Sequence, residues 1–307
     1  MLMNLRTAYG EELLALAKEN SRVVALDADL CGSTQSVVIE KNFPERYFEM
    51  GIGEQNMISV AAGLSLTGKI PFAHSFAVFA SGRPFDQIRQ SVCLPKLNVK
   101  IVGSSCGLSD FGDGATHQSF EDLATMRVLP GMTVFCPADG VETKWAVREA
   151  AAIDGPVYIR LNRNDLPVIF DENTPFATGK PLVVKEGSQV ALMGTGTMTA
   201  IAMEAADLLE KKGISVRVIH LGTIKPIDGE ALAKSVNGVK GIVTCEEHTI
   251  YGGLGSAVAE ALCAAPLPMR MVGIQDRYGQ SAVCYDELLV HYGLTKENIA
   301  AAAEKLL

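Results

Sequence analysis

The stretch that decides the fold reads MGIGEQNMISVAAGLSLTGKIPFAHS and runs from Met50 to Ser75. After a Gly-Ile-Gly bend, residues 54–67 place apolar side chains on one face, as an amphipathic helix does. Residues 70–75 then form a short apolar run, which is typical of a strand covered on both faces. A helix followed directly by a buried strand indicates an α/β protein.

The same alternation continues along the whole chain. It predicts an α/β fold with two open, mostly parallel sheets flanked by helices. The predicted strands are 22–28, 70–75, 98–104, 132–138, 156–161, 188–195, 215–221, 241–247 and 268–274. The predicted helices are 9–20, 54–67, 80–93, 140–153, 199–213, 229–236, 252–264 and 294–306.

One segment interrupts the alternation. NDLPVIFDENTPFATGKPLVVKEG, from Asn164 to Gly187, carries three prolines and little helical periodicity. We therefore predict a first domain over 1–165, a linker over 166–187 and a second domain over 188–307, both domains being of ordinary size.

Composition narrows the class of protein. The chain has 307 residues, is 48% hydrophobic and carries a net charge of −8, so neither nucleic acid nor an anionic membrane surface is expected as a partner. No apolar run reaches the ~20 residues that span a bilayer. The N-terminus does not resemble a signal peptide, and the seven cysteines include no C-x-x-C pair. These features predict a cytoplasmic protein with reduced thiols.

Glu54 stands in the first turn of the predicted helix 54–67, although the run that follows it is almost uncharged. An acid at a helix N-terminus adds ~0.3–1 kcal/mol of stability, which is the simplest explanation. A carboxylate in apolar surroundings, however, needs a partner or an altered pKa. The helix alone leaves both explanations open.

A glycine-rich stretch, SDFGDGATHQSFEDLATMRVLPGM, runs from Ser109 to Met132. It follows the predicted strand 98–104, at the end where open α/β sheets bind ligands. Asp113 and His117 lie four residues apart around Gly114, so both can point into one pocket. An ordinary surface turn explains the pattern equally well.

Two arginines end the predicted strand 156–161. Because Arg160 and Arg163 lie three apart on an extended segment, they face opposite sides. We expect one to make a structural ion pair and the other to hold an anion. Further along, Gly194 and Gly196 lack the third glycine of a nucleotide fingerprint, so we predict a tight turn into a helix capped by Thr197 or Thr199.

Taken together, these stretches resemble the C-terminal half of a transketolase or of 1-deoxyxylulose-5-phosphate synthase. The resemblance covers nearly the whole chain and rests on an ordered set of segments. These are ALDADL, FEMGIGEQNM, FAVF, DGATHQSFEDLATMRVLPGM, RLNR, GTGTMTAIAMEAADLL, IKPID and EEHTIYGGLGSAVAEAL. It implies a pyrimidine-binding domain followed by a transketolase C-terminal domain.

The resemblance also implies a cofactor and a partner. The family uses thiamine diphosphate with Mg²⁺ or Ca²⁺, and its metal motif needs an Asn after GDG that is missing after residues 112–114. We therefore expect no metal ligand here. The metal would be bound by a separate N-terminal subunit with the diphosphate-binding domain, in an α2β2 heterotetramer with a homodimeric core.

For the cofactor, the resemblance implies that Glu54 hydrogen-bonds N1′ of the aminopyrimidine and acts in catalysis. Phe79 and Phe76 match the aromatic residues that stack on that ring, although core packing is the usual role of a Phe. Asp29 matches an acid near the thiamine at the subunit interface. Gln55, with Met57, is expected to line the same wall.

For the substrate, the resemblance implies that Asp113 and His117 contact hydroxyls and the carbonyl, His117 as a catalytic group, and that Arg163 holds a phosphate. One departure concerns Ser105 and Cys106, where a transketolase has a second phosphate-binding His. The sequence thus predicts a weakened phosphate site and an unusual acceptor sugar.

The predicted function is transfer of a two-carbon ketol unit between sugar phosphates by the subunit of a split transketolase. Alternatives are a synthase-like condensation with pyruvate and the β-subunit of a 2-oxoacid dehydrogenase. A regulatory or binding module is the alternative outside enzymes. The donor and acceptor sugars stay open.

Overall fold

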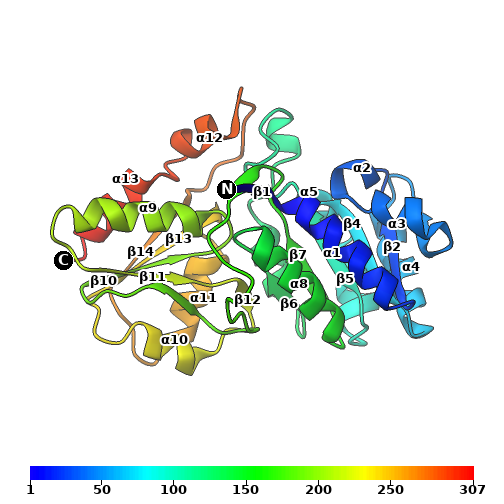
Figure 1. Cartoon of the computed structure of the whole chain (residues 1–307), viewed down its shortest axis with the longest axis horizontal. Helices are drawn as coiled ribbons and strands as arrows, with labels where there is room; N and C mark the ends of the chain where they lie inside the picture. The colour runs from blue at the N-terminus through cyan, green and yellow to red at the C-terminus, as the bar shows by residue number, and fades with distance from the viewer.

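The computed structural model describes residues 1–307 and shows two lobes side by side, each built on one open sheet (Figure 1). The N-terminal lobe has a seven-stranded sheet in the order β12-β6-β7-β5-β4-β2-β3, parallel except between β12 and β6. Its strands are β2 (Val23–Asp27), β3 (Tyr47–Glu49), β4 (Ile70–Phe76), β5 (Lys100–Ser104), β6 (Thr133–Phe135), β7 (Val157–Arg160) and β12 (Thr223–Lys225).

Helices cover both faces of this sheet, which explains why its central strands are buried and mostly apolar. One face packs against α1 (Leu5–Glu19), α3 (Val37–Asn42) and α8 (Gly140–Ala152). The other packs against α4 (Glu54–Leu66), α5 (Ala77–Gly82), α7 (Asp122–Arg127) and the π-helix η2 (Ile88–Cys93). Short turns of helix complete the lobe: α2 (Cys31–Thr34), α6 (Phe85–Gln87), η1 (Pro44–Arg46) and η3 (Gly114–Thr116).

The C-terminal lobe has a five-stranded sheet in the order β14-β13-β10-β11-β9, parallel except between β11 and β9. Its strands are β9 (Leu182–Lys185), β10 (Val190–Gly194), β11 (Val216–His220), β13 (Ile242–Thr249) and β14 (Met269–Ile274). Its helices are α9 (Met198–Glu210), α10 (Gly229–Ser235), α11 (Leu254–Ala261), α12 (Tyr285–His291) and α13 (Lys296–Glu304). No helix in the chain has the length and apolar character needed to cross a membrane.

The predicted fold class is confirmed, and every predicted strand is present within a few residues of its predicted ends. The predicted linker 166–187 is partly structured. β8 (Asp165–Pro167) pairs antiparallel with β1 (Leu2–Asn4), and β9 joins the five-stranded sheet. The division into domains at residues 165 and 188 stays a prediction, because β12 lies in the sequence of the second domain and in the sheet of the first.

Two local predictions are wrong. The single helix expected over 80–93 is divided into α5, α6 and η2 around Arg83 and Pro84, since proline removes a backbone donor and disrupts a continuing helix. Neither Thr197 nor Thr199 caps α9 with its side chain. Instead, the Thr199 hydroxyl lies 2.7 Å from Nδ1 of the buried His220.

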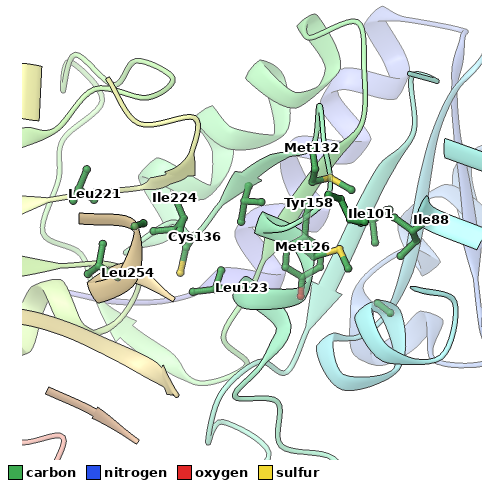
Figure 2. Packing of buried hydrophobic residues seen from close by; sticks show 14 of the residues in the cluster. Ile88, Ile101, Leu123, Met126, Met132, Cys136, Tyr158, Leu221, Ile224 and Leu254 are labelled. Atoms are coloured by element: carbon green, nitrogen blue, oxygen red, sulfur yellow. The ribbon is translucent and has the colours of Figure 1, made fainter. Parts of the chain in front are cut away.

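The two lobes share one hydrophobic core. Figure 2 shows Leu221 and Leu254 of the C-terminal lobe, with Ile224 of β12 beside them, reaching toward Cys136 and Leu123 of the N-terminal lobe. β12 reinforces this contact, because it pairs with β6 at the edge of the other lobe's sheet. The lobes are therefore held by both packing and backbone hydrogen bonds.

A buried ion pair lies where β7 meets this interface. Arg160 donates from Nε to a carboxylate oxygen of Asp122 at 2.8 Å, and both side chains are almost fully buried. Nη2 of Arg160 also donates to the backbone oxygens of Ser119, at 3.3 Å, and Glu247, at 2.9 Å. Burial raises the pKa of Asp122, but the charge of Arg160 and its hydrogen bonds lower it below its ordinary value. This is the structural ion pair expected of one of the two arginines.

Replacing one member of this pair should destabilise the whole chain. In Asp122→Asn, Arg160 keeps its charge in the interior without a counter-charge, which typically lowers the free energy of unfolding by about 3–5 kcal/mol. Urea denaturation followed by circular dichroism measures the change.

The matched control is Glu19→Gln, which breaks the exposed pair with Arg148. Solvent screens that pair, so we expect its denaturation midpoint to stay unchanged. A loss below about 1 kcal/mol in Asp122→Asn would contradict the importance of the buried pair.

Candidate active site

The candidate site lies at the carboxyl end of β4 and β5. These two strands are parallel neighbours, so the segments that leave them start from the same edge of the sheet. β4 leads into α5 with Phe76 and Phe79, and β5 leads into the glycine-rich loop with Asp113 and His117. The first turn of α4 carries Glu54 (Figure 1).

Glu54 is buried, with 4% of its surface exposed, and its carboxylate does not cap its own helix. Nη1 of Arg83 donates to Oε1 of Glu54 at 2.7 Å. The second carboxylate oxygen, Oε2, accepts no hydrogen bond within the chain. Glu54 thus has a partner that the sequence did not reveal and one oxygen that is free for a ligand.

Three aromatic rings gather beside Glu54. Phe76 and Phe79 lie nearly parallel, at 13° and with ring centroids 6.2 Å apart. The edge of His117 meets both rings, at 6.3 Å from Phe76 and 5.2 Å from Phe79. The structure therefore brings together predicted residues from the end of β4, from α5 and from the glycine-rich loop.

Arg83 links the aromatic rings to the carboxylate. Its guanidinium carbon lies 3.9 Å from the centroid of the Phe79 ring, a cation–π contact, while the same group bonds Glu54. A flat, nitrogen-bearing group can therefore stack on Phe79 and donate to Glu54 at the same time. The geometry fits a planar heterocycle that has hydrogen-bonding nitrogens at its edge.

The other predicted cofactor residues do not hydrogen-bond to the carboxylate of Glu54 or stack on the aromatic rings. Gln55 is exposed and donates to the backbone oxygen of Arg83 at 3.2 Å. Asp29 is exposed and adopts a left-handed backbone with φ of 62°. Met57 is completely buried in the core, so the expectation that it lines the site is wrong.

Arg163 and the glycine-rich loop form the second part of the site. Nη1 of Arg163 donates to Oδ1 of Asp110 at 2.6 Å. Burial raises the pKa of Asp110, and the negative charge of Asp113 adds to that shift while Arg163 and His117 oppose it. Asp110, Asp113, His117 and Arg163 therefore lie within electrostatic reach of one another.

The sequence analysis missed Arg6, whose Nη1 donates to the backbone oxygen of Ser33 at 3.0 Å. Burial lowers the pKa of Arg6 and the positive charge of Arg163 lowers it further, while Asp110 and Asp165 oppose the shift. Two guanidinium groups thus face the same region, although they stand at opposite ends of the N-terminal lobe's sequence. No periodicity or spacing could have paired them.

Ser105 and Cys106 are both buried, at 0% and 3% exposure. Ser105 has a left-handed backbone with φ of 52°, and its hydroxyl has no hydrogen-bond partner. A larger side chain at Ser105 would have to displace packed neighbours. A histidine at this position would therefore have to displace packed neighbours before it could contact a phosphate.

We expect Ser105→His to lower the stability of the chain by about 2 kcal/mol or more, because overpacking adds to the backbone strain. Ser105→Gly is the matched control, since glycine adopts positive φ without strain and adds no volume. Thermal denaturation compares the two. A histidine variant as stable as the glycine variant would mean that space exists beside this position.

Comparison with known proteins places this chain among the transketolases. A family model described as transketolase, pyrimidine binding domain matches residues 2–168, and one described as transketolase, C-terminal domain matches residues 179–299. The chain is 46% identical to a putative transketolase C-terminal section of Methanocaldococcus jannaschii, over 96% of this chain and 94% of that protein. It is 43% identical to the 6-deoxy-6-sulfo-D-fructose transketolase subunit SqwH of a Clostridium strain, over 98% of this chain and 94% of that protein.

Solved structures give the same result. A structure described as a split gene transketolase, inactive beta4 tetramer, superposes with a TM-score of 0.92 at 50% identity, covering 99% of this chain and 98% of that one. Human transketolase is 38% identical, and the chain matches 49% of its length.

The chain belongs to the transketolase family. Within it, the chain is a transferase subunit of the split type, with a pyrimidine-binding and a C-terminal domain.

Proposed function

We propose that this subunit, together with a separate diphosphate-binding subunit, transfers a two-carbon ketol unit between sugar phosphates or closely related sugars. Thiamine diphosphate is the proposed cofactor, and the proposed assembly is an α2β2 heterotetramer. The metal, Mg²⁺ or Ca²⁺, belongs to the partner in this proposal. The observation that carries it is the buried Glu54 with one free carboxylate oxygen beside Phe79.

Glu54 and the aromatic residues would hold the aminopyrimidine ring. Thiamine diphosphate, when bound, supplies the nucleophilic carbon that accepts the ketol unit. Glu54 would exchange a proton at N1′ through Oε2, and Phe79 would support the ring face. Since Glu54 is almost excluded from water, its hydrogen bond to the ring is strengthened by the low local dielectric. In support, the planar guanidinium of Arg83 stacks on Phe79 and donates to Glu54 in the structure.

His117, Asp113 and Arg163 would bind the sugar. His117 contacts the Phe76 and Phe79 rings and stands on the same loop as Asp113, so this loop would place both side chains beside the proposed cofactor position. Its imidazole would donate a hydrogen bond to a substrate oxygen. Arg163 and Arg6 would attract the acidic end of the sugar.

The relatives' names support transketolase chemistry over the two alternatives with thiamine diphosphate. Related subunits are named for 6-deoxy-6-sulfo-D-fructose and for apulose 4-phosphate, so acceptors and donors differ within the family. A screen of ketose donors against aldose acceptors, with both subunits, cofactor and Mg²⁺ present, would identify this chain's sugars. Condensation of pyruvate in the same screen would favour the synthase-like alternative.

Glu54→Gln should fold normally yet lose most activity in the reconstituted enzyme. The amide cannot exchange a proton with the ring, and loss of a general acid–base partner typically lowers the rate ~10²–10⁴-fold. Glu45→Gln, at an exposed position on the same lobe, is the control and should keep full activity. Near-normal turnover by the Glu54 variant would remove the central support of the proposal.

The chain alone should show no ketol transfer, because the proposal assigns the diphosphate and metal contacts to a second subunit. The related structure described as an inactive beta4 tetramer supports this expectation. Activity is measured by a coupled assay before and after adding the partner subunit. Turnover by the single chain, with mass spectrometry detecting no partner, would contradict the split arrangement.

A further inference from the structure

The Arg163 side chain, which is expected to bind the acidic end of the sugar, is already paired within the chain. Its Nη1 lies 2.6 Å from Oδ1 of Asp110. The Arg163 side chain is 31% exposed, whereas that of Asp110 is only 3% exposed. One edge of the Arg163 guanidinium can therefore contact a ligand, while its other edge is bonded to the buried Asp110.

The negative charge of the buried Asp110 is balanced by the positive charge of Arg163. The second oxygen of Asp110, Oδ2, is buried and accepts no hydrogen bond, so Arg163 is the one cation that bonds the carboxylate, while the side chain of Asp113 lies close to it as well. A buried carboxylate without water is strongly stabilised by an adjacent cation. The reverse also holds: the carboxylate cancels much of the attraction that Arg163 exerts on an incoming anion.

The wider surroundings add no excess of positive charge. Arg163 and Asp113 lie within electrostatic reach of Asp110, and Arg6 lies within reach of both Arg163 and Asp110, so two arginines stand against two aspartates here. Asp165 adds a further negative charge near Arg6. A phosphate monoester carries about −1.5 to −2 charge at neutral pH, so it enters a region with no net charge to match it.

We propose that Asp110 is a specificity-determining residue that selects against doubly charged phosphate and for sugars whose end carries at most one negative charge. It acts through Arg163, which it holds and partly neutralises. The inference rests on the proposed function for the role of the site, and it narrows the class of substrate.

The size of the effect should follow the charge of the ligand. Coulomb energy is proportional to the product of the charges, so a dianion is repelled by Asp110 twice as strongly as a monoanion. Removing the charge should therefore improve binding of a dianion by roughly tenfold, of a monoanion by roughly threefold, and of a neutral sugar not at all. A simple loss of structure would not produce this order.

The test uses Asp110→Asn, which keeps the shape of the side chain and an oxygen that accepts from Arg163. Inorganic phosphate, mostly a dianion at pH 8, and methanesulfonate, a monoanion, serve as competitive inhibitors of the reconstituted enzyme. An uncharged aldose serves as the neutral substrate. We expect the inhibition constants to fall about tenfold and threefold, while the KM of the uncharged aldose stays constant.

Asp165→Asn is the matched control, because it removes an equal negative charge two residues after Arg163. Asp165 is exposed and bonds Asn4, at 3.0 Å, instead of Arg163. Its variant should change each constant by less than about twofold. Equal changes for phosphate, methanesulfonate and aldose in Asp110→Asn, or weaker phosphate inhibition, would overturn the proposal.

A second measurement needs no variant and no catalysis. Binding of phosphate and of methanesulfonate to the wild-type full chain at pH 8 is measured by isothermal titration calorimetry. The proposal predicts that methanesulfonate binds at least as tightly as phosphate, and clearly tighter phosphate binding would overturn it. Because this measurement needs no ketol transfer, failure of the proposed function and failure of this inference can be told apart.

Discussion

The ion pair between Arg160 and Asp122 is the interaction on which the rest of the structure depends. One guanidinium joins the end of β7, the start of α7, the end of the glycine-rich loop at Ser119 and the backbone of Glu247 in the other lobe. A buried charge tolerates little displacement, because each lost bond leaves it unsatisfied. The position of the loop that carries His117 is therefore fixed by an arginine that does not itself face the ligand.

The interface between the lobes strengthens the same region. Glu247 accepts from the backbone of Leu108 at 2.7 Å and from the side chain of Asn162 at 3.2 Å, and burial raises its pKa to about 7. These contacts reach the glycine-rich loop and the segment that leads to Arg163. The C-terminal lobe thus contributes to the candidate site by supporting its loops, although the proposed ligand-binding side chains come from the N-terminal lobe.

The sequence predicted the long elements well because a strand covered on both faces is mostly apolar, as the first four residues of VVALD in β2 are. It missed three-residue strands such as β12, whose place depends on the partner edge and not on its own residues. At the site, motif spacing indicated Glu54, His117 and Arg163. Their partners Arg83 and Asp110 became visible only in the fold, because an ion pair depends on side-chain geometry across loops and leaves no periodic pattern.

The strand β12 follows the N-terminal lobe in sequence but completes its sheet, which affects how that lobe would behave alone. β6 lies one strand from the end of its sheet, and β12 covers its outer hydrogen-bonding groups. If the N-terminal lobe were produced alone, β6 would become an edge with unpaired backbone groups, which readily captures strands from other molecules. The C-terminal lobe therefore protects the N-terminal lobe from self-association. Cutting the chain between the two lobes would remove β12 from the N-terminal lobe's sheet and expose β6.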